Sequence, residues 1–367
     1  MKRYIWQNKN FPDFTYDKET ILKLLAQVKL QEGLLLGKIE GLGFEHNRKA
    51  LLSTLTEDIV KSNEIEGLSL DINQVRSSIG RRLGIDTAGD VTIERSVEGI
   101  VEMMLDATQN FNKEMSEERL FGWQAAMFPG GYNGLYKIKT GAYRDDANGP
   151  MQVVSGAIGH EKVHYEAPPA GTLKKEMNRL IEYINNDTED TDLIIKAAIV
   201  HLWFVIIHPF EDGNGRIARA LTDMLLARSE NSSNRFYSMS AQIKKVRNSY
   251  YEILQLTQKD SVDITCWLKW FLENLILAIK NSDILLKSVL ARAEFWKKHA
   301  LTPLNERQIK ILNKILEDFE GKLTTTKWAK MCNCSQDTAT RDITDLINKG
   351  ILSKHGEARA THYLINI

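Results

Sequence analysis

The segment from Leu193 to Ile207 constrains the fold of this chain more than any other feature. It is apolar apart from Lys196 and His201. A helix that is apolar on nearly all sides is typical of the centre of a globular protein. The segment is too short to cross a bilayer, which needs about 20 apolar residues. We therefore expect a fold that is built around this helix.

Apolar residues recur at helical spacing along most of the remaining sequence. We expect helices over residues 17–39, 46–63, 92–110, 117–128, 172–186, 190–207, 214–229, 243–258, 262–281 and 283–298. Region 130–170 is different, because it is rich in glycine and has short β-prone pieces at 152–154 and 162–165. This pattern predicts a long loop with a small hairpin, and such loops in compact domains are usually functional.

Composition narrows the classes of partner. The chain has 48 Lys plus Arg and 48 Asp plus Glu. This balance implies no general affinity for nucleic acid or acidic membranes. The odd number of cysteines favours reduced thiols, and the polar N-terminus lacks the apolar run of a signal peptide. We therefore expect a cytoplasmic protein that does not contact the membrane.

A glycine-containing turn follows the apolar helix. We expect that helix to end near His208, because Pro209 disfavours a helical conformation in the residue before it. Gly213 and Gly215 permit a tight turn, and a new helix begins at about Asn214. Such a turn presents several unpaired N–H groups at a helix N-terminus, which together with the helix dipole form an anion site.

Four polar side chains flank this turn. Arg216 and Arg219 are three residues apart, and two guanidinium groups suit phosphate oxygens. Asp212 offers an oxygen ligand for the Mg²⁺ of a bound nucleotide. The pKa range of His208 suits a general base for an attacking hydroxyl. Each residue alone has an ordinary structural explanation, but their order around one turn favours a nucleotide site. The P-loop and dinucleotide-fold motifs are both absent.

The segment His208–Arg219, HPFEDGNGRIAR, matches the Fic family signature HPFx[DE]GNGRxxR at every defined position. The chain therefore resembles the Fic family, an all-helical fold whose members mostly transfer AMP from ATP to a hydroxyl of a target protein. The resemblance implies a mostly all-α fold with a β-hairpin flap in region 130–170. It also implies ATP as a substrate, Mg²⁺ as a cofactor, and a protein target that bears a Ser, Thr or Tyr hydroxyl. We expect a target segment to add to the flap as a strand.

The resemblance assigns roles to the residues of the signature. It implies His208 as the base and Asp212 as the Mg²⁺ ligand, with Phe210 as an apolar anchor. The turn amides and Asn214 would lie on the α-phosphate side, and the two arginines on the β- and γ-phosphates. The implied nucleotide-binding residues are Gly213, Asn214, Gly215, Arg216, Arg219 and Tyr251. Tyr251 comes from a segment that resembles the adenine-lining region of relatives and equally fits an amphipathic core helix.

A second motif lies at the end of an expected helix. Ser62–Gly67, SNEIEG, matches the family's inhibitory motif [ST]xxxE[GN]. A Glu66 carboxylate that pairs with Arg219 would take the place of the γ-phosphate, so ATP would bind in a pose unsuited to in-line attack. We expect Ser62 and Glu66 to form an inhibitory site. Glu66 could also position a water that removes AMP, and the alternative is an ordinary helix end.

We expect three regions, and the last changes in pattern after Thr302. They are an N-terminal helical region over 1–90, a Fic catalytic domain over 91–300, and a winged helix-turn-helix domain over 301–367. The last has helical runs at 305–317, 325–331 and 336–349 before a strand-prone tail from Ile351 to Ile365. Ser335 would cap the third helix, and Gly350 would end it.

Two functions compete at this point. The first is an AMP-transferring enzyme, with UMP or phosphoryl transfer left open. The second is a DNA- or protein-binding regulator that uses the Fic fold as a nucleotide sensor. The intact base and metal ligand favour the enzyme. The residues of the C-terminal domain that could face DNA are Thr338, Thr340, Arg341 and Lys349, although such domains often bind protein instead. The family resemblance makes a homodimer plausible.

Overall fold

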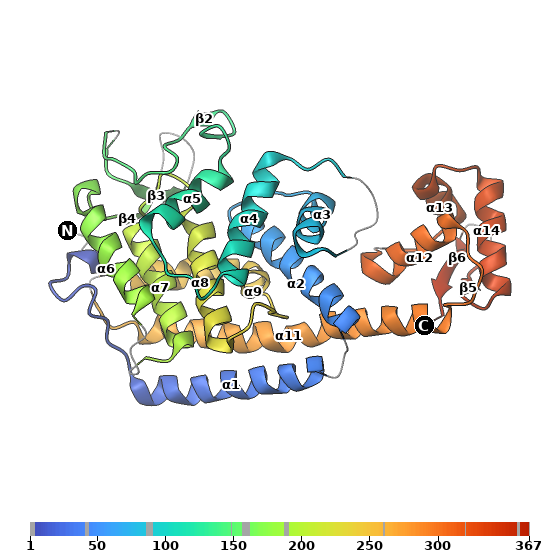
Figure 1. Ribbon diagram of the computed structural model, residues 1–367, viewed down its shortest axis with the longest axis horizontal. Helices are drawn as coiled ribbons and strands as arrows, with labels where there is room; N and C mark the ends of the chain where they lie inside the picture. Colours follow the sequence, from blue (N-terminus) through green and yellow to red (C-terminus); the bar gives the residue numbers. More distant parts are fainter. Residues whose placement is uncertain are drawn as a thin grey trace. The chain divides into compact units, whose positions relative to one another are not determined.

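The structure is a computed structural model that describes residues 4–40, 44–85, 91–147, 149–155, 162–186, 191–259, 261–319, 321–357 and 360–366. The chain divides into two compact units, Met1–Asp283 and Ile284–Ile367. As the sequence predicts, the described residues are mostly helical (Figure 1). The predicted domain boundary at residue 90 lies outside the described residues, and the three domain ranges stay a prediction. Among the described helices, none is long and apolar enough to span a membrane.

The first unit contains most of the helices and two small hairpins. Its helices are α1 (Lys18–Glu40), α2 (Phe44–Ile65), α3 (Ile72–Leu83), α4 (Arg95–Gln109), α5 (Glu117–Met127), α6 (Leu173–Asn185), α7 (Leu193–Ile207), α8 (Asn214–Glu230), α9 (Met239–Lys245), α10 (Arg247–Thr257) and the first part of α11 (Thr265–Lys298). Two 3-10 turns, η1 (Ile5–Gln7) and η2 (Ala170–Thr172), accompany them. The antiparallel hairpins pair β1 (Tyr132–Asn133) with β2 (Tyr136–Lys137), and β3 (Gln152–Ser155) with β4 (Lys162–Glu166).

Helix α7 is central, as its apolar sequence predicts. Its residues from Ile194 to Ile207 are all buried, and it packs against α6 and α8 (Figure 1). Its two ionisable side chains have partners. His201 is 2.8 Å from both the Thr222 and the Tyr250 hydroxyl groups, and Lys196 Nζ donates to the Asn186 carbonyl over 2.9 Å. These bonds offset the cost of burying polar groups.

The predicted helices differ from the structure in three main respects. The predicted helices do not include α3, although Asp71 caps its start and Gly84 ends it in a left-handed conformation. The expected helix 243–258 is divided at Val246, whose N–H bonds to the carbonyls of both Gln242 and Ile243. The two helices expected over 262–298 form the single helix α11. The polar residues between them have partners, because Ser282 Oγ donates to the Ile279 carbonyl and Asp283 pairs with Lys38.

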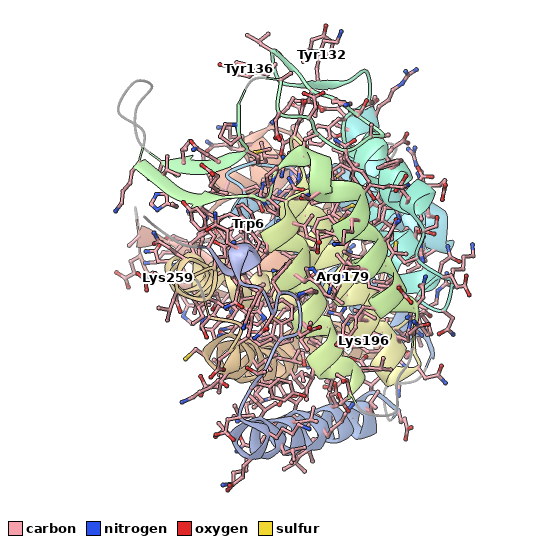
Figure 2. The ribbon with its side chains drawn as sticks, turned by 90° about the vertical axis from the view of Figure 1, so that its left-hand side faces the viewer. Trp6, Tyr132, Tyr136, Arg179, Lys196 and Lys259 are labelled. Carbon is pink, nitrogen blue, oxygen red and sulfur yellow. The ribbon has the colours of Figure 1, made fainter. Side chains whose placement is uncertain are left out.

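The N-terminal segment 4–16 lies across the first unit. The Tyr4 ring meets the Tyr165 ring edge-on with centroids 5.2 Å apart. Trp6, labelled in Figure 2, donates from Nε1 to the Glu166 carbonyl over 2.9 Å. Farther along, Thr15 N donates to the Val262 carbonyl and Ile264 N to the Thr15 carbonyl. The segment therefore bonds to the end of β4 and to the residues just before α11.

The second unit has the element order that the sequence predicts. It contains α12 (Glu306–Asp318), α13 (Thr325–Cys332), α14 (Gln336–Asn348) and an antiparallel pair, β5 (Leu352–His355) and β6 (His362–Ile365). Ser335 caps α14 by accepting from Thr338 N, and Gly350 ends it with φ 71°. Trp328 is fully buried in the core of this unit. Its assignment as a winged helix stays a prediction.

Candidate active site

Residues 208–213 connect α7 to α8, and His208 sets the direction of this connection. It caps α7 in a left-handed conformation, with φ 51° and ψ 58°, and its N–H bonds to the Phe204 carbonyl over 2.9 Å. Helix α7 therefore ends where Pro209 predicts. A left-handed residue at a helix end turns the chain away from the helix axis. The turn leads directly to the N-terminus of α8 at Asn214.

The connection is closed by Asn214 and anchored by Phe210. The Asn214 side chain accepts from Phe210 N over 3.0 Å and donates to the Phe210 carbonyl over 2.8 Å. Phe210 is fully buried against the rings of Phe121, Tyr143 and Phe204. The Asn214 amide thus shapes the turn itself, and its backbone N–H stays at the start of α8.

Arg144 fixes the base residue from outside the signature. It is buried, and its Nε donates to the His208 carbonyl over 2.8 Å. Its Nη2 donates to the Pro168 carbonyl over 2.6 Å, and its backbone N–H bonds to the Pro209 carbonyl over 2.9 Å. Arg144 therefore ties both ends of the flap region to the turn. Nothing in the sequence indicates this role of Arg144, apart from its place at the start of that region.

The two arginines of the signature are buried and only partly bonded. Arg216 lies over the Phe128 ring at 4.9 Å, and its Nη2 is 3.5 Å from Asp212 Oδ1. Within the described part of the chain, Arg216 Nε and Arg219 Nη1 are buried donors without a partner. Gly213, with φ 90°, precedes α8 and offers no side-chain cap. Unpaired guanidinium donors beside an uncapped helix N-terminus fit a bound anion such as a phosphate.

Asp212 accepts two short hydrogen bonds in addition to its contact with Arg216. Its Oδ1 accepts from Gly213 N over 2.5 Å, and its Oδ2 accepts from Asn133 Nδ2 over 2.5 Å. Asn133 belongs to hairpin β1–β2, which the sequence did not predict. No group of three His, Cys, Asp or Glu side chains that could hold a metal occurs in the described ranges. One carboxylate fits Mg²⁺ that is held mainly by nucleotide phosphates and water.

Glu66 and Ser62, at the end of α2, accept hydrogen bonds from the guanidinium of Arg219. Glu66 Oε1 accepts from Arg219 Nη2 over 2.7 Å, and Ser62 Oγ accepts from Arg219 Nε over 2.7 Å. Burial alone would raise the pKa of Glu66, but the Arg219 guanidinium outweighs it and lowers that pKa. A Cβ at Gly215 would lie 2.2 Å from Glu66 Oε1. Glycine is therefore required there for the carboxylate to approach.

The His208 ring is suited to accept a proton. Burial lowers the pKa of His208 to about 4, so the ring is neutral near pH 7. Its Nδ1 lies 3.4 Å from the Val205 carbonyl, which can only accept. Nδ1 therefore carries the proton, and Nε2 has the free lone pair that a general base needs.

Tyr251 on α10 lies near the end of α2. Its side chain is partly exposed, and the Arg247 guanidinium covers its ring at 4.9 Å. Its hydroxyl is 3.4 Å from the Ile65 carbonyl. Its predicted role beside adenine stays a prediction.

Two hairpins form in the glycine-rich region 130–170. The predicted hairpin forms as β3–β4, with an irregular register between Val153 and Val154. The β1–β2 hairpin carries Tyr132 and Tyr136, which project outward with 52% and 77% of their surface exposed (Figure 2). Asn133, between them in sequence, reaches Asp212 instead. The β1–β2 hairpin therefore connects two exposed tyrosines to the signature turn.

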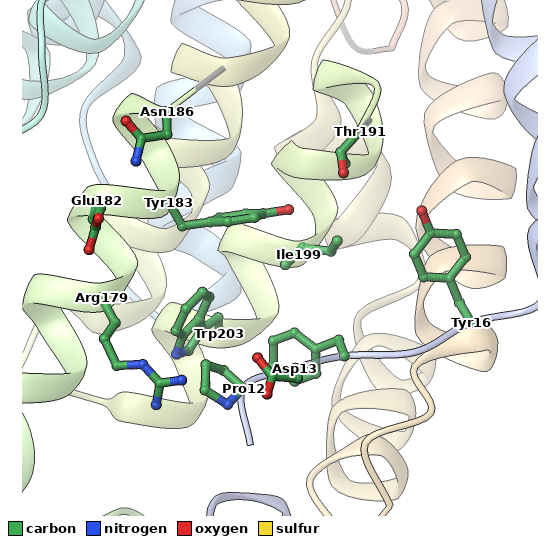
Figure 3. Close-up of a pocket in the computed structure, with 11 residues that line it drawn as sticks. Pro12, Asp13, Tyr16, Arg179, Glu182, Tyr183, Asn186, Thr191, Ile199 and Trp203 are labelled. Atoms are coloured by element: carbon green, nitrogen blue, oxygen red, sulfur yellow. The ribbon is translucent and has the colours of Figure 1, made fainter. Parts of the chain in front are cut away.

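A separate cavity of about 470 Å³ lies between the N-terminal segment and helices α6 and α7 (Figure 3). Its lining residues are Pro12, Asp13, Phe14, Tyr16, Arg179, Glu182, Tyr183, Asn186, Thr191, Ile199 and Trp203. None of them belongs to the residues that the sequence predicts for the nucleotide. This cavity is therefore not the candidate active site.

Known families match two parts of the chain. Residues 114–226, which include the signature, match the family described as Fic/DOC family. This part of the chain is a Fic/DOC family domain. Residues 4–85 match a family described as Domain of unknown function (DUF4172). The Fic domain is thus preceded by a second recognised region that contains Ser62 and Glu66.

Several curated relatives of the Fic domain are named protein adenylyltransferases. A probable protein adenylyltransferase of Aquifex aeolicus is 24% identical over 50% of this chain and 52% of its own length. Protein adenylyltransferase Fic of Drosophila yakuba is 34% identical over 26% of this chain and 18% of its own length. The chain thus spans about half or less of these relatives.

Solved structures show the same fold. A Fic family protein from Desulfovibrio desulfuricans G20 has a TM-score of 0.55 and 19% identity, covering 97% of this chain and 98% of its own. Fic-1 of Caenorhabditis elegans has a TM-score of 0.50 and 19% identity, covering 73% of this chain and 74% of its own.

Proposed function

We propose that this chain transfers AMP from ATP to a Ser, Thr or Tyr hydroxyl of a protein target, and that Glu66 keeps it mostly inactive. The observation that carries the proposal is the arrangement around the start of α8. A neutral histidine, a carboxylate and two incompletely bonded arginines surround one uncapped helix N-terminus. The family of the domain and the names of its relatives support nucleotidyl transfer in general.

The proposed reaction uses the residues of this chain as follows. His208 Nε2 takes the proton of the target hydroxyl as that oxygen bonds to the α-phosphorus of ATP. The bond from the α-phosphorus to the bridging oxygen breaks, and pyrophosphate leaves. Arg216 and Arg219 hold the β- and γ-phosphates, and the amides at the start of α8 receive charge on the α-phosphate. Asp212 would hold Mg²⁺, which neutralises phosphate charge when bound.

The Glu66–Arg219 ion pair supports the proposed inhibition. A γ-phosphate would need the same guanidinium, so ATP and Glu66 compete for it. An ATP molecule that lacks this contact would sit with its α-phosphate poorly aligned for attack. Release of Glu66 is therefore the proposed route to the active state.

The experiment compares the unmodified chain with three purified variants, each incubated with ATP labelled at the α- or the γ-phosphate. We expect Glu66→Gly to incorporate α-label on the order of 10-fold or more above the unmodified chain, the effect of releasing a state populated about nine parts in ten. Glu66→Gly with His208→Ala should incorporate none. Glu19→Gln, which removes an exposed carboxylate that pairs with Lys23 on α1, should match the unmodified chain.

The outcomes separate the competing functions. Label from the γ-phosphate alone would indicate phosphoryl transfer. No label in Glu66→Gly from either position of ATP would favour the regulator that senses nucleotides without transferring them. Release of AMP from prelabelled protein, when it is incubated with Mg²⁺ and the chain that keeps Glu66, would show that the same site also removes AMP. The homodimer, the DNA contact of the C-terminal unit and the three domain ranges stay predictions.

A further inference from the structure

The end of α2 has a defined backbone geometry that determines where Glu66 points. Gly67 has φ 82°, and its N–H bonds to the Glu64 carbonyl over 3.1 Å. Leu68 N bonds to the Asn63 carbonyl over 3.1 Å. These two bonds form a Schellman motif with Glu66 as the C-cap residue. They explain why the motif ends in glycine, and they leave the Ile65 carbonyl outside the motif.

Two cationic side chains from α9 and α10 bind the carbonyls of this turn. Lys244 Nζ donates to the Glu64 carbonyl over 2.8 Å, and Arg247 Nε donates to the Ile65 carbonyl over 2.7 Å. The C-terminus of a helix carries partial negative charge and unpaired carbonyls, so cations stabilise it. Hydrogen bonds from charged donors are stronger than neutral ones. Lys244 and Arg247 therefore form a cationic clamp on the last turn of α2.

A second contact attaches α2 to α9 one or two turns earlier. Asp58 Oδ1 accepts from Ser238 Oγ over 2.5 Å and from Ser240 N over 3.2 Å, and all three residues are buried. Helix α2 is thus attached at Asp58 independently of the clamp. Loss of the clamp alone should release the last turn while the rest of α2 stays in place.

We propose that Lys244 and Arg247 are positioning residues for Glu66, and that the clamp holds the chain in its inactive form. Both donate to backbone carbonyls of α2, whereas the Glu66 side chain binds Arg219. Without the clamp the Schellman turn would fray, Glu66 would leave Arg219 more often, and the guanidinium would become available to nucleotide. The activity readout of this proposal rests on the proposed AMP transfer, so a second readout is independent of it.

The activity test uses the double variant Lys244→Ala, Arg247→Ala and the control Lys245→Ala, which removes an exposed cation from the same end of α9. Each is made with Glu66 present and with Glu66→Gly. We expect the double variant to raise α-label incorporation roughly tenfold when Glu66 is present (about 1.4 kcal/mol). With Glu66→Gly it should change incorporation less than twofold. Lys245→Ala should have no effect in either case.

Conservative exchange gives a further check on positioning. Lys244→Arg keeps a cationic donor and should restore inhibition in the presence of Arg247. Equal activation with and without Glu66 would overturn the proposal, because it would place the clamp outside the inhibitory mechanism. No activation with Glu66 present, in a background where Glu66→Gly is active, would also overturn it.

Hydrogen exchange tests the clamp even if no nucleotide transfer occurs. We expect the amides of Gly67 and Leu68 to exchange at least several-fold faster in the double variant than in Lys245→Ala, while the amides near Asp58 keep their protection. Unchanged exchange at Gly67 and Leu68 would overturn the clamp. Faster exchange without label in any variant would support the clamp and reject the proposed transfer.

Discussion

The signature loop (residues 208–219) and the α2 turn (residues 62–67) meet at Arg219, but they are held in different ways. Bonds within the loop shape it, chiefly those between Asn214 and the backbone of Phe210. The α2 turn depends on partners far along the chain, since 153 residues separate Glu66 from Arg219. A site that is shaped locally is stable in its geometry, whereas a turn held by distant side chains can be released. This difference suits the proposed roles of the loop as a fixed catalytic site and of the α2 turn as a removable inhibitor.

The largest expected effect in this comparison comes from Arg144, a distant residue that holds the backbone of the loop. Arg144→Leu, in the Glu66→Gly background, should lower the rate of label transfer about 100-fold, because small displacements of reacting groups are that costly. It would leave the carbonyls of His208 and Pro168 without their donor. Initial rates with α-labelled ATP measure the effect.

A matched control for this variant is Arg179→Leu. Arg179 is partly exposed on α6, and its bonds to Glu176 and to the Phe11 carbonyl are both long, at 3.5 Å. We expect it to change the rate less than twofold. An unchanged rate in Arg144→Leu would mean that the loop holds its own shape without outside support.

A smaller effect should come from the second contact of the α2 turn. Ser62→Ala removes the acceptor of Arg219 Nε but leaves the Glu66 ion pair. A hydrogen bond to a charged group is worth about 1.5–3 kcal/mol. Only part of this free energy favours the inhibited state over the state in which Glu66 has left Arg219, so we expect a roughly threefold activation. Ser53→Ala, earlier on α2, serves as the control. Activation equal to that of Glu66→Gly would show that Ser62, not the carboxylate, is the main restraint.

The smallest expected effect concerns pH. Burial lowers the pKa of His208 to about 4, so the ring is neutral above that value and protonates only below it. The kcat/KM of the Glu66→Gly variant for ATP, which reports the free enzyme, should change less than about twofold between pH 8 and pH 5.5. A histidine with the ordinary pKa of about 6.5 would lose roughly 90% of its neutral form at pH 5.5. An inflection near pH 6.5 would contradict a base that is neutral in this range.

The same shift has a consequence for stability. Because the folded-state pKa of His208 lies below its unfolded value, the unfolded chain binds more protons between about pH 4 and pH 6.5. The contribution of His208 to stability is therefore retained above this window and is lost as pH falls through it.

Much of the fold and the site could be predicted because the relevant signals are local. The apolar run of α7 predicts its burial, and Pro209 predicts its end. Ser335 and Gly350 predict the ends of α14 by the same kind of local chemistry. Helix α3 could have been found from Asp71 and Gly84, which are ordinary cap residues. These signals act through bonds within a few residues, so the sequence alone carries them.

The sequence by itself determined the helical class of the fold, the central α7 and the set of chemical groups that follows it. Only the tertiary structure decided that Asn133 bonds to Asp212 and that Arg144 bonds to the His208 carbonyl. It also decided that side chains of α9 and α10 bond to the carbonyls at the end of α2. The physical reason is that these contacts join separate elements whose approach depends on the packing of the whole unit. A periodicity or a motif describes one element, and it does not determine which distant side chain completes a hydrogen bond.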